Sequence, residues 1–362
     1  MTNRLLFLFV SLLISGCGNK HESKTAPQDF SATNEAFRYS GRTEKMGDSA
    51  VALISSASFV STKAEGDSIT LYLESPDANH AYVALEVNND YKGRFKVDGE
   101  PLKIALSDSV QRNEISIYKA TEASSGDVLF KGVKAENITA PEITEEKPMI
   151  DFIGNSITCG MWAQTDDIPC GEGEWYDQHN AYLAYGPRVA RALDADFRLS
   201  CVSGMGMYRN WNDEDQPVMP DVYENLRLNG DDSKKADLSE APDVVSIALG
   251  TNDLSEGDGE KERNEFSKEK YVKRYIGFVQ HIFELYPHTK VALLSSPMIT
   301  GEKNEILTDC LDQVKNHFED KDIRVFHFEN IEIHGCGGHP SVEDNQKMAE
   351  QLIPFFKNIL NQ

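Results

Sequence analysis

The hydrophobic pattern of this chain changes its period partway along the sequence. From about residue 35 to residue 140, short segments alternate apolar and polar residues, as in 69–73 and 81–87. This period of two is typical of strands that bury one face. Turn residues recur at short intervals, and the Asp98-Gly99 step between two such segments is a strong hairpin signal. We therefore predict an antiparallel β-sandwich over residues 35–145.

An acidic, proline-marked stretch near residues 140–148 is typical of a linker, and the pattern changes after it. Short apolar segments then alternate with segments of helical spacing. The predicted strands lie at 149–153, 197–202, 244–249, 291–294 and 323–326, and the predicted helices lie at 181–193, 271–285 and 341–360. This alternation implies an α/β domain over residues 146–362, with a parallel sheet covered on both faces.

The composition excludes several classes of protein. The 362 residues include 36 Lys and Arg against 59 Asp and Glu, which gives a net charge of −23. A nucleic-acid partner demands a basic surface, so this balance argues against one, and also against docking on anionic lipid through charge. Hydrophobic residues make up 40% of the chain, which argues against disorder. Nothing in the sequence implies a protein partner.

Residues 1–17 are typical of a targeting signal. Arg4 gives a positive start, a short apolar run follows, and Ser15-Gly16 stand directly before Cys17. Small residues before a cysteine resemble the lipobox of a bacterial lipoprotein, in which Cys17 would become the first residue and carry acyl chains. The alternative is an ordinary secretory signal. We expect a lipid-anchored protein of the bacterial cell envelope, periplasmic or at the cell surface, with residues 18–34 as a polar tether.

Five further cysteines follow, an odd number that leaves at least one thiol unpaired in an oxidising compartment. They are Cys159, Cys170, Cys201, Cys310 and Cys336. Cys159 and Cys170 are close in sequence and are candidates for a pair, although the sequence leaves the pairing open. No grouping of His, Cys, Asp and Glu has metal-ligand spacing, and no glycine-rich phosphate loop is present. We therefore predict neither a metal nor a cofactor.

Candidate site residues follow successive predicted strands. Ser156, Gly204 and Asn252 each lie just beyond the end of one strand. His339 stands directly before the last helix, for which Ser341 is a good N-cap. In an open α/β sheet, ligands bind at the carboxyl ends of the strands. We therefore expect these residues to meet at one edge of the sheet.

These residue types suit serine catalysis. The Ser156 hydroxyl is a weak nucleophile until a base takes its proton, and His339 is the natural base because its pKa lies near neutrality. The N–H groups of Ser156 and Gly204 and the side chain of Asn252 would hold the oxyanion. Losing one such donor typically costs about 2.7–4 kcal/mol of barrier. Taken singly, each residue is more often a cap, turn or surface residue, so the hypothesis depends on their order.

The order Gly-Asn-Ser, then Gly204, then Gly-Thr-Asn-Asp, then His-Pro-Ser resembles the SGNH hydrolases, which have a three-layer α/β/α fold. A closer resemblance, from about residue 37 to the C-terminus, is to carbohydrate esterase family two. The segments that carry it are 39–42, 118–122, 150–160, 180–186, 203–210 and 339–342. This resemblance implies a jelly-roll domain joined to an SGNH domain. It also implies a carbohydrate O-acetylesterase that removes acetyl groups from plant-type polysaccharides or oligosaccharides, such as xylan or glucomannan, through an acyl-enzyme.

The sequence departs from the SGNH pattern directly before His339. SGNH enzymes usually place an Asp there to orient the imidazole, whereas residues 335–338 are Gly-Cys-Gly-Gly. Loss of the triad Asp generally lowers turnover while some catalysis remains. A backbone carbonyl such as that of Gly337 could set the tautomer, or a distant carboxylate such as Glu332 could reach the ring. The resemblance favours the backbone carbonyl, because the family is thought to tolerate a Ser-His dyad.

Two tryptophans near the motif segments, Trp175 and Trp211, are candidates for stacking on sugar rings. The alternative for each is core packing. Two other functions stay open. A carbohydrate-binding lipoprotein with a degraded esterase site would account for the missing Asp. An SGNH lipase or thioesterase would use the same serine and histidine on a different ester.

Overall fold

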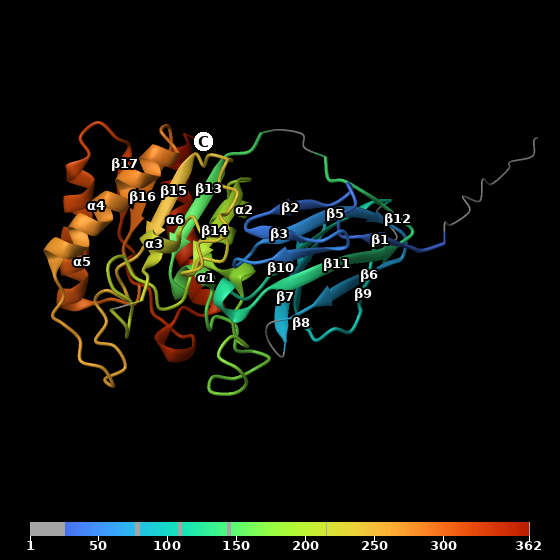
Figure 1. Cartoon of the computed structure of the whole chain (residues 1–362), viewed down its shortest axis with the longest axis horizontal. Coiled ribbons are helices and arrows are strands. Elements are labelled where there is room, and N and C mark those ends of the chain that lie inside the picture. Colours follow the sequence, from blue (N-terminus) through green and yellow to red (C-terminus); the bar gives the residue numbers. More distant parts are fainter. Residues whose placement is uncertain (1–25, 77–79, 108–110, 143–145, 215, 362) are drawn as a thin grey trace, which may run out of the picture.

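The computed structural model describes residues 26–76, 80–107, 111–142, 146–214 and 216–361, which form two domains side by side. In Figure 1, the first domain runs from blue to teal and the second from green to red. The predicted signal, Cys17 and the first part of the predicted tether lie outside the described residues.

The first domain consists of two antiparallel sheets of six strands each. Its strands are β1 (Gln28–Ser31), β2 (Arg38–Ser40), β3 (Thr43–Met46), β4 (Ala50–Leu53), β5 (Phe59–Glu65), β6 (Ser68–Glu74), β7 (Ala81–Val87), β8 (Asp90–Val97), β9 (Leu102–Ala105), β10 (Asn113–Lys119), β11 (Val128–Ala135) and β12 (Asn137–Thr139). One sheet has the order β3-β4-β11-β6-β9, with β1 beside β11, and the other has the order β12-β5-β10-β7-β8, with β2 beside β5. Alternate side chains such as Leu71, Val83 and Phe130 form one buried core between the sheets. The predicted antiparallel sandwich is confirmed.

The predicted tether is too long at its C-terminal end. Residues Gln28–Ser31 form β1, which pairs with the segment 132–135 of β11. The Tyr39 hydroxyl also donates to the carbonyl of Ala32, at 2.6 Å. The polar sequence of β1 hides it from a hydropathy pattern, because only Phe30 points toward the core as a partly buried apolar side chain.

The second domain is built on one parallel sheet, with the order β14-β13-β15-β16-β17. Its elements are β13 (Met149–Gly154), α1 (Ser156–Cys159), α2 (Tyr185–Ala192), β14 (Asp196–Cys201), α3 (Met219–Val222), β15 (Val244–Ala248), α4 (Lys268–Leu285), β16 (Lys290–Leu294), α5 (Gly301–His317), β17 (Ile323–Phe326) and α6 (Val342–Leu360). Consecutive side chains along a strand pack into different hydrophobic cores. Ile150 and Phe152 pack with α2 and α6, whereas Ile153 packs with the residues of α4 and α5. The predicted α/β domain, with helices on both faces of the sheet, is confirmed.

Two helices differ from the prediction. The helix predicted at 181–193 is divided into a short 3₁₀ turn, Ala181–Leu183, and α2. Ala184 is extended between them, and the Tyr185 N–H donates to the side chain of Asn345 instead of to a preceding turn. Helix α5 was not predicted. Its buried face consists of Leu307, Cys310, Leu311 and Val314, which do have helical spacing.

The disulfides differ from the pair suggested by sequence proximity. Cys159 is bonded to Cys201, and Cys170 is bonded to Cys336. Cys310 is a buried free thiol. The suggested Cys159–Cys170 pair is therefore wrong. Cys159 and Cys170 are not partners because their surroundings differ. Cys159 lies in α1, which packs against the end of β14, whereas Cys170 lies in the long connection after α1 and meets the segment before α6.

The two domains share a buried polar contact at Arg42. This side chain of the first domain donates to the carbonyl groups of Tyr223, at 2.6 Å, and Asn225, at 3.0 Å, and to the Ser200 hydroxyl. Burial lowers the pKa of Arg42 to about 10. The nearby Asp151 carboxylate in β13 accepts from Arg198, Ser200 and Tyr223. The domain interface is thus fixed by directional bonds to a buried cation.

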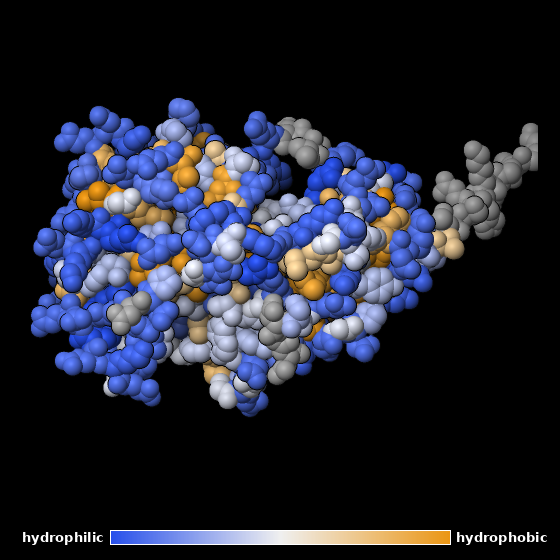
Figure 2. Space-filling model, viewed as in Figure 1, coloured by the Kyte–Doolittle hydropathy of each residue, from blue (hydrophilic) through white to orange (hydrophobic). Residues whose placement is uncertain are grey.

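Figure 2 shows hydrophilic residues over most of the face in view, with hydrophobic residues in small separate groups. Three large hydrophobic side chains of the described residues are exposed, namely Met46, Trp175 and Trp211. None of the helices in the described ranges has the length and hydropathy that a bilayer crossing requires.

Candidate active site

The site lies where the order of the parallel sheet reverses. β13 is flanked by β14 on one side and β15 on the other, and Gly154 is in register with both Cys201 and Ala248. The chain leaves the three strands at the same edge, so the loops after them are neighbours. This is the position at which an open α/β sheet binds ligands.

Ser156 is the first residue of α1. Asn155 caps this helix, because its side-chain oxygen accepts from the Ile157 N–H at 3.2 Å. Asn155 therefore fixes the start of the helix at Ser156. The Cys159–Cys201 disulfide joins the other end of α1 to the end of β14. Ser156 is buried except for 6% of its surface.

His339 reaches this serine from the far end of the chain. Its Nε2 lies 2.9 Å from the Ser156 Oγ, within hydrogen-bonding distance. Ser341 begins α6 as its N-cap, and Asp344 completes a capping box by accepting from the Ser341 N–H at 3.0 Å. The rigid start of α6 therefore places the imidazole against the hydroxyl. This geometry is that of a nucleophile and its base.

The surroundings of the imidazole explain how it is held without an Asp. Its Nδ1 is buried and has no partner in hydrogen-bond geometry within the described ranges, although the carbonyls of Cys336 and Gly337 lie close enough to raise its pKa. Burial has the larger, opposite effect and lowers the pKa of His339 below 6.5. The Trp162 indole packs edge-on against the ring, with centroids 5.1 Å apart. Packing and backbone dipoles take the place of the carboxylate.

Glu332, the alternative orienting group, does not reach His339. Its side chain is 86% exposed and lies 3.6 Å from the other histidine of this segment, His334. Asp344 is likewise occupied by His334, at 2.8 Å. That alternative is wrong because the Glu332 side chain lies in solvent beside His334.

Glycine is required at Gly337 by its neighbours. The residue has φ +56°, and a Cβ there would overlap the Trp162 ring that packs on His339. The following Gly338 also has a positive φ of +73°, but a Cβ there would meet no atom within 4 Å. The glycine-rich sequence therefore lets the backbone lie close to the imidazole and the indole.

The structure brings the predicted oxyanion residues to the same edge. Gly204 has φ +79°, and a Cβ there would lie 2.8 Å from the Trp211 ring, so only glycine fits. The Asn252 Nδ2 donates to the carbonyl of Met205 at 2.7 Å, which ties the loop after β15 to the loop after β14. This bond uses one of the two N–H groups of the amide and leaves the other for a ligand.

Residues 152–351 match the GDSL-like Lipase/Acylhydrolase family, and residues 39–141 match the Carbohydrate esterase 2 N-terminal family. The chain belongs to the GDSL-like lipase/acylhydrolase family. With a Ser-His dyad at the edge of its sheet, this GDSL-like chain is a carboxylic ester hydrolase, as predicted.

Relatives resemble both domains of this GDSL-like chain. An acetylxylan esterase / glucomannan deacetylase of Cellvibrio japonicus (strain Ueda107) is 24% identical over 366 residues, 99% of this chain and 98% of that protein. The structure of a family two carbohydrate esterase from Cellvibrio japonicus has a TM-score of 0.80 at 22% identity and covers 93% of this chain and 99% of that one. One from Clostridium thermocellum in complex with cellohexaose has a TM-score of 0.76 at 24% identity and covers 90% and 99%. The predicted resemblance is confirmed, and the fold is that of the family two esterases.

Asp253 is a site residue of this GDSL-like domain that the sequence analysis gave no role. Its buried carboxylate accepts from the N–H groups of Met207, Tyr208 and Arg209, at 2.8–3.2 Å. Burial raises the pKa of Asp253 to about 6, against the opposing effect of these bonds. The carboxylate thus fixes the loop that contains Gly204. The sequence signal that could have identified Asp253 is its position directly after Asn252.

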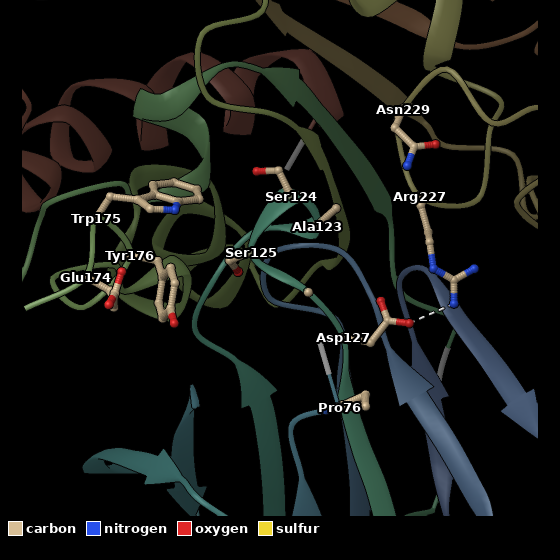
Figure 3. Close-up of a pocket in the computed structure, with 11 residues that line it drawn as sticks. Pro76, Ala123, Ser124, Ser125, Asp127, Glu174, Trp175, Tyr176, Arg227 and Asn229 are labelled. Carbon is tan, nitrogen blue, oxygen red and sulfur yellow. Dashed lines mark hydrogen bonds and ion pairs between the residues drawn. The ribbon is translucent and has the colours of Figure 1, made fainter. Parts of the chain in front are cut away.

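The two predicted sugar-binding tryptophans line cavities. A cavity of about 740 Å³ lies between the domains, with Trp175 on one side and Arg227 and Asn229 on the other (Figure 3). A second cavity of about 390 Å³ is lined by Trp211, Ser203 and Gly204, and also by Asn229. Trp175 and Trp211 are 40% and 38% exposed, so neither is a core residue of the GDSL-like domain. In the described part of the chain, no group of three His, Cys, Asp or Glu could hold a metal ion.

Proposed function

We propose that this protein is a carbohydrate O-acetylesterase that removes acetyl groups from polysaccharides or oligosaccharides such as xylan or glucomannan. The observation that carries the proposal is the 2.9 Å contact between Ser156 Oγ and His339 Nε2 at the reversal point of the sheet. A serine beside an uncharged imidazole is the arrangement that acyl transfer needs.

The proposed reaction proceeds through an acetyl-enzyme. His339 takes the Ser156 proton as the oxygen attacks the acetyl carbonyl, and it then gives that proton to the departing sugar hydroxyl. The N–H groups of Ser156 and Gly204 and the Asn252 amide stabilise the oxyanion. Water, deprotonated by the same imidazole, then attacks the acetyl-enzyme. Acetate leaves, and Ser156 regains its proton.

The cavities and the relatives support a carbohydrate as the alcohol part of the ester. The two cavities share Asn229, so one groove can pass Gly204 with a tryptophan on each side. Aromatic faces of this kind bind sugar rings by stacking. The Cellvibrio japonicus relative is named an acetylxylan esterase / glucomannan deacetylase, and the Clostridium thermocellum structure holds a glucose hexamer.

The direct test is acetate release from acetylated xylan and acetylated glucomannan by the full-length protein in detergent. We expect release by the wild type and a loss of about a thousandfold or more in Ser156→Ala. Ser239→Ala, which changes an exposed serine, is the matched control and should keep full activity. A Ser156→Ala variant with the wild-type rate would show that the nucleophile is assigned wrongly.

Two alternatives have distinct outcomes in the same assay. A series of p-nitrophenyl esters of increasing acyl length would favour acetate for the proposed enzyme and long chains for a lipase. A degraded, carbohydrate-binding protein would bind the glycans without releasing acetate. The intact dyad speaks against degradation, although the orienting Asp is missing.

We also propose that acyl chains on Cys17 anchor the protein in the bacterial cell envelope. The support is the Ile14-Ser15-Gly16-Cys17 sequence after a short apolar run. Labelled palmitate should enter the wild type and remain absent from Cys17→Ser, which should leave the membrane fraction. Equal labelling of both proteins would contradict the anchor.

A further inference from the structure

A buried carboxylate of the first domain reaches the loop that follows β14. Glu122 lies between β10 and a 3₁₀ turn at Ala123–Ser125, and its side chain has no exposed surface. Its carboxylate accepts from the Ser203 N–H, at 3.2 Å to the nearer oxygen, and from the Ser203 hydroxyl. Because Ser203 directly precedes Gly204, this carboxylate holds the backbone next to the oxyanion donor.

Glu122 is itself held in place by its own domain. The buried Lys119 Nζ donates to the carbonyl of Glu122 at 2.6 Å, and the Ser125 hydroxyl donates to the same carbonyl at 2.7 Å. The Ser124 hydroxyl donates to the carboxylate. A buried carboxylate costs free energy of desolvation, and burial raises the pKa of Glu122 accordingly. Such a group is expected where its hydrogen bonds have a specific purpose.

His179 flanks the carboxylate without taking over its bonds. Its Nε2 lies 3.9 Å from the nearer Glu122 oxygen, and neither ring nitrogen has a hydrogen-bond partner in the described ranges. Burial lowers its pKa well below 6.5, and the nearby His339 lowers it further. His179 is therefore neutral, so it forms no ion pair, and the hydrogen-bonding capacity of Glu122 is directed to Ser203 and Ser124.

We propose that Glu122 is a positioning residue through which the first domain completes the active site of the second. Its two bonds to Ser203 fix the start of the loop that presents the Gly204 N–H. Asp253 and Asn252 fix the same loop farther along. Oxyanion donors are effective when they are in place before charge develops, and a misplacement of about 1 Å can cost a hundredfold in rate. The inference rests on the proposed esterase function, which assigns Gly204 its role.

The test compares Glu122→Gln with Glu86→Gln, both in the full-length protein with p-nitrophenyl acetate. A glutamine has a single acceptor oxygen and an NH₂ group that faces hydrogen-bond donors, so Ser203 loses part of its support. Glu86 is the matched control because it is also a buried carboxylate of the first domain that accepts from the second, from the Tyr182 hydroxyl at 2.5 Å. We expect kcat to fall about ten- to a hundredfold in Glu122→Gln, with KM within about twofold. Glu86→Gln should lower Tm while kcat stays unchanged.

A second readout separates positioning from general loosening. Methylboronic acid adds to an active-site serine as a tetrahedral anion, and its inhibition constant should rise in Glu122→Gln by the factor by which kcat/KM falls. Inhibition by free acetate should not change. Ser203→Ala removes one of the two bonds, so the double variant with Glu122→Gln should lose less than the product of the single losses. If Glu122→Gln does not fold, Ser203→Ala alone tests the inference, and it should show a lower kcat at unchanged KM.

The outcomes distinguish this inference from the proposed function. If hydrolysis depends on Ser156 and Glu122→Gln keeps kcat within twofold, or Glu86→Gln lowers kcat equally, the positioning role is overturned and the esterase stands. If the wild type shows no turnover that depends on Ser156, the esterase is overturned, and the role of Glu122 with it.

Discussion

Cys336, which lies shortly before His339, is bonded to Cys170, with their Cα atoms 5.4 Å apart. The segment that contains His339, the proposed base, is thus covalently tied to the connection that contains Trp162 and Trp175. Cys170 is exposed, whereas Cys159 and Cys201 of the other disulfide are completely buried. The two bonds therefore differ in their access to reductant.

We expect mild reductant to open Cys170–Cys336 first and to lower kcat reversibly by several-fold, because the segment that contains His339 is released. The Cys170→Ser/Cys336→Ser variant should reproduce the loss and reduce the free energy of unfolding by about 2–5 kcal/mol. Alkylation of free thiols followed by peptide mass spectrometry would identify the opened bond. Cys310→Ala removes the free thiol found among the described residues and should respond to reductant like the wild type. Full activity of the double variant would contradict this prediction.

Substitution of two adjacent glycines should separate backbone strain from steric overlap. Gly337→Ala and Gly338→Ala both place a Cβ on a residue with positive φ, which costs about 1–2 kcal/mol. Only the first drives the Cβ into Trp162 and so disturbs the packing on His339. We expect Gly337→Ala to lower kcat at least about tenfold and Gly338→Ala to retain most of it. Equal kcat values for the two variants would show that the indole does not hold the ring.

Titration of His339 should reflect its burial. Burial disfavours the charged imidazolium and lowers the pKa below 6.5, and the base must be neutral to act. Activity should therefore persist as the pH falls to 6.5 and decline only through the lowered pKa. Asp253, with a pKa of about 6, also titrates below pH 6.5, so NMR of the imidazole carbons is the direct measurement. The His339 signal is assigned by its loss in His339→Gln, and titration at or above 6.5 would refute the prediction.

The buried cation between the domains should be a strong determinant of stability. Arg42→Met leaves the carbonyls of Tyr223 and Asn225 without their donor, which should cost about 3–5 kcal/mol. Arg38→Met changes an exposed arginine of β2 and should change stability by less than about 1 kcal/mol. Urea unfolding measures both. A similar midpoint for the two variants would show that the interface depends little on Arg42.

The sequence was informative wherever a pattern was local. The period of two in β6 and β7 and the apolar strands β13 and β15 follow from burial on one or both faces, so the pattern predicts them. Helix α5 had the same kind of signal in Leu307, Leu311 and Val314, and the prediction overlooked it. Strand β1 had too little apolar content to be seen.

Contacts between distant segments could not be predicted, because no local pattern records them. The cysteine partners are set by which strand ends lie together, and sequence separation gives no measure of that. The meeting of Ser156 and His339 could be predicted because both lie at element ends that a parallel sheet collects at one edge. No such rule connects Glu122 to Ser203, since the bond depends on how the first domain packs against the second.

Arg42 joins the sandwich to the second domain, and the role proposed for Glu122 gives the sandwich a place in the chemistry as well, which limits how the gene can be rearranged. Both are buried charged groups that hydrogen-bond to the other half of the polypeptide. If the second domain were produced alone, the carbonyls that accept from Arg42 would lose their donor, and the loop that contains Gly204 would lose its bonds to Glu122. Fusion of the second domain to an unrelated sandwich would have the same effect. We therefore expect the two halves to be inherited together, as a single unit that recombination cannot shuffle.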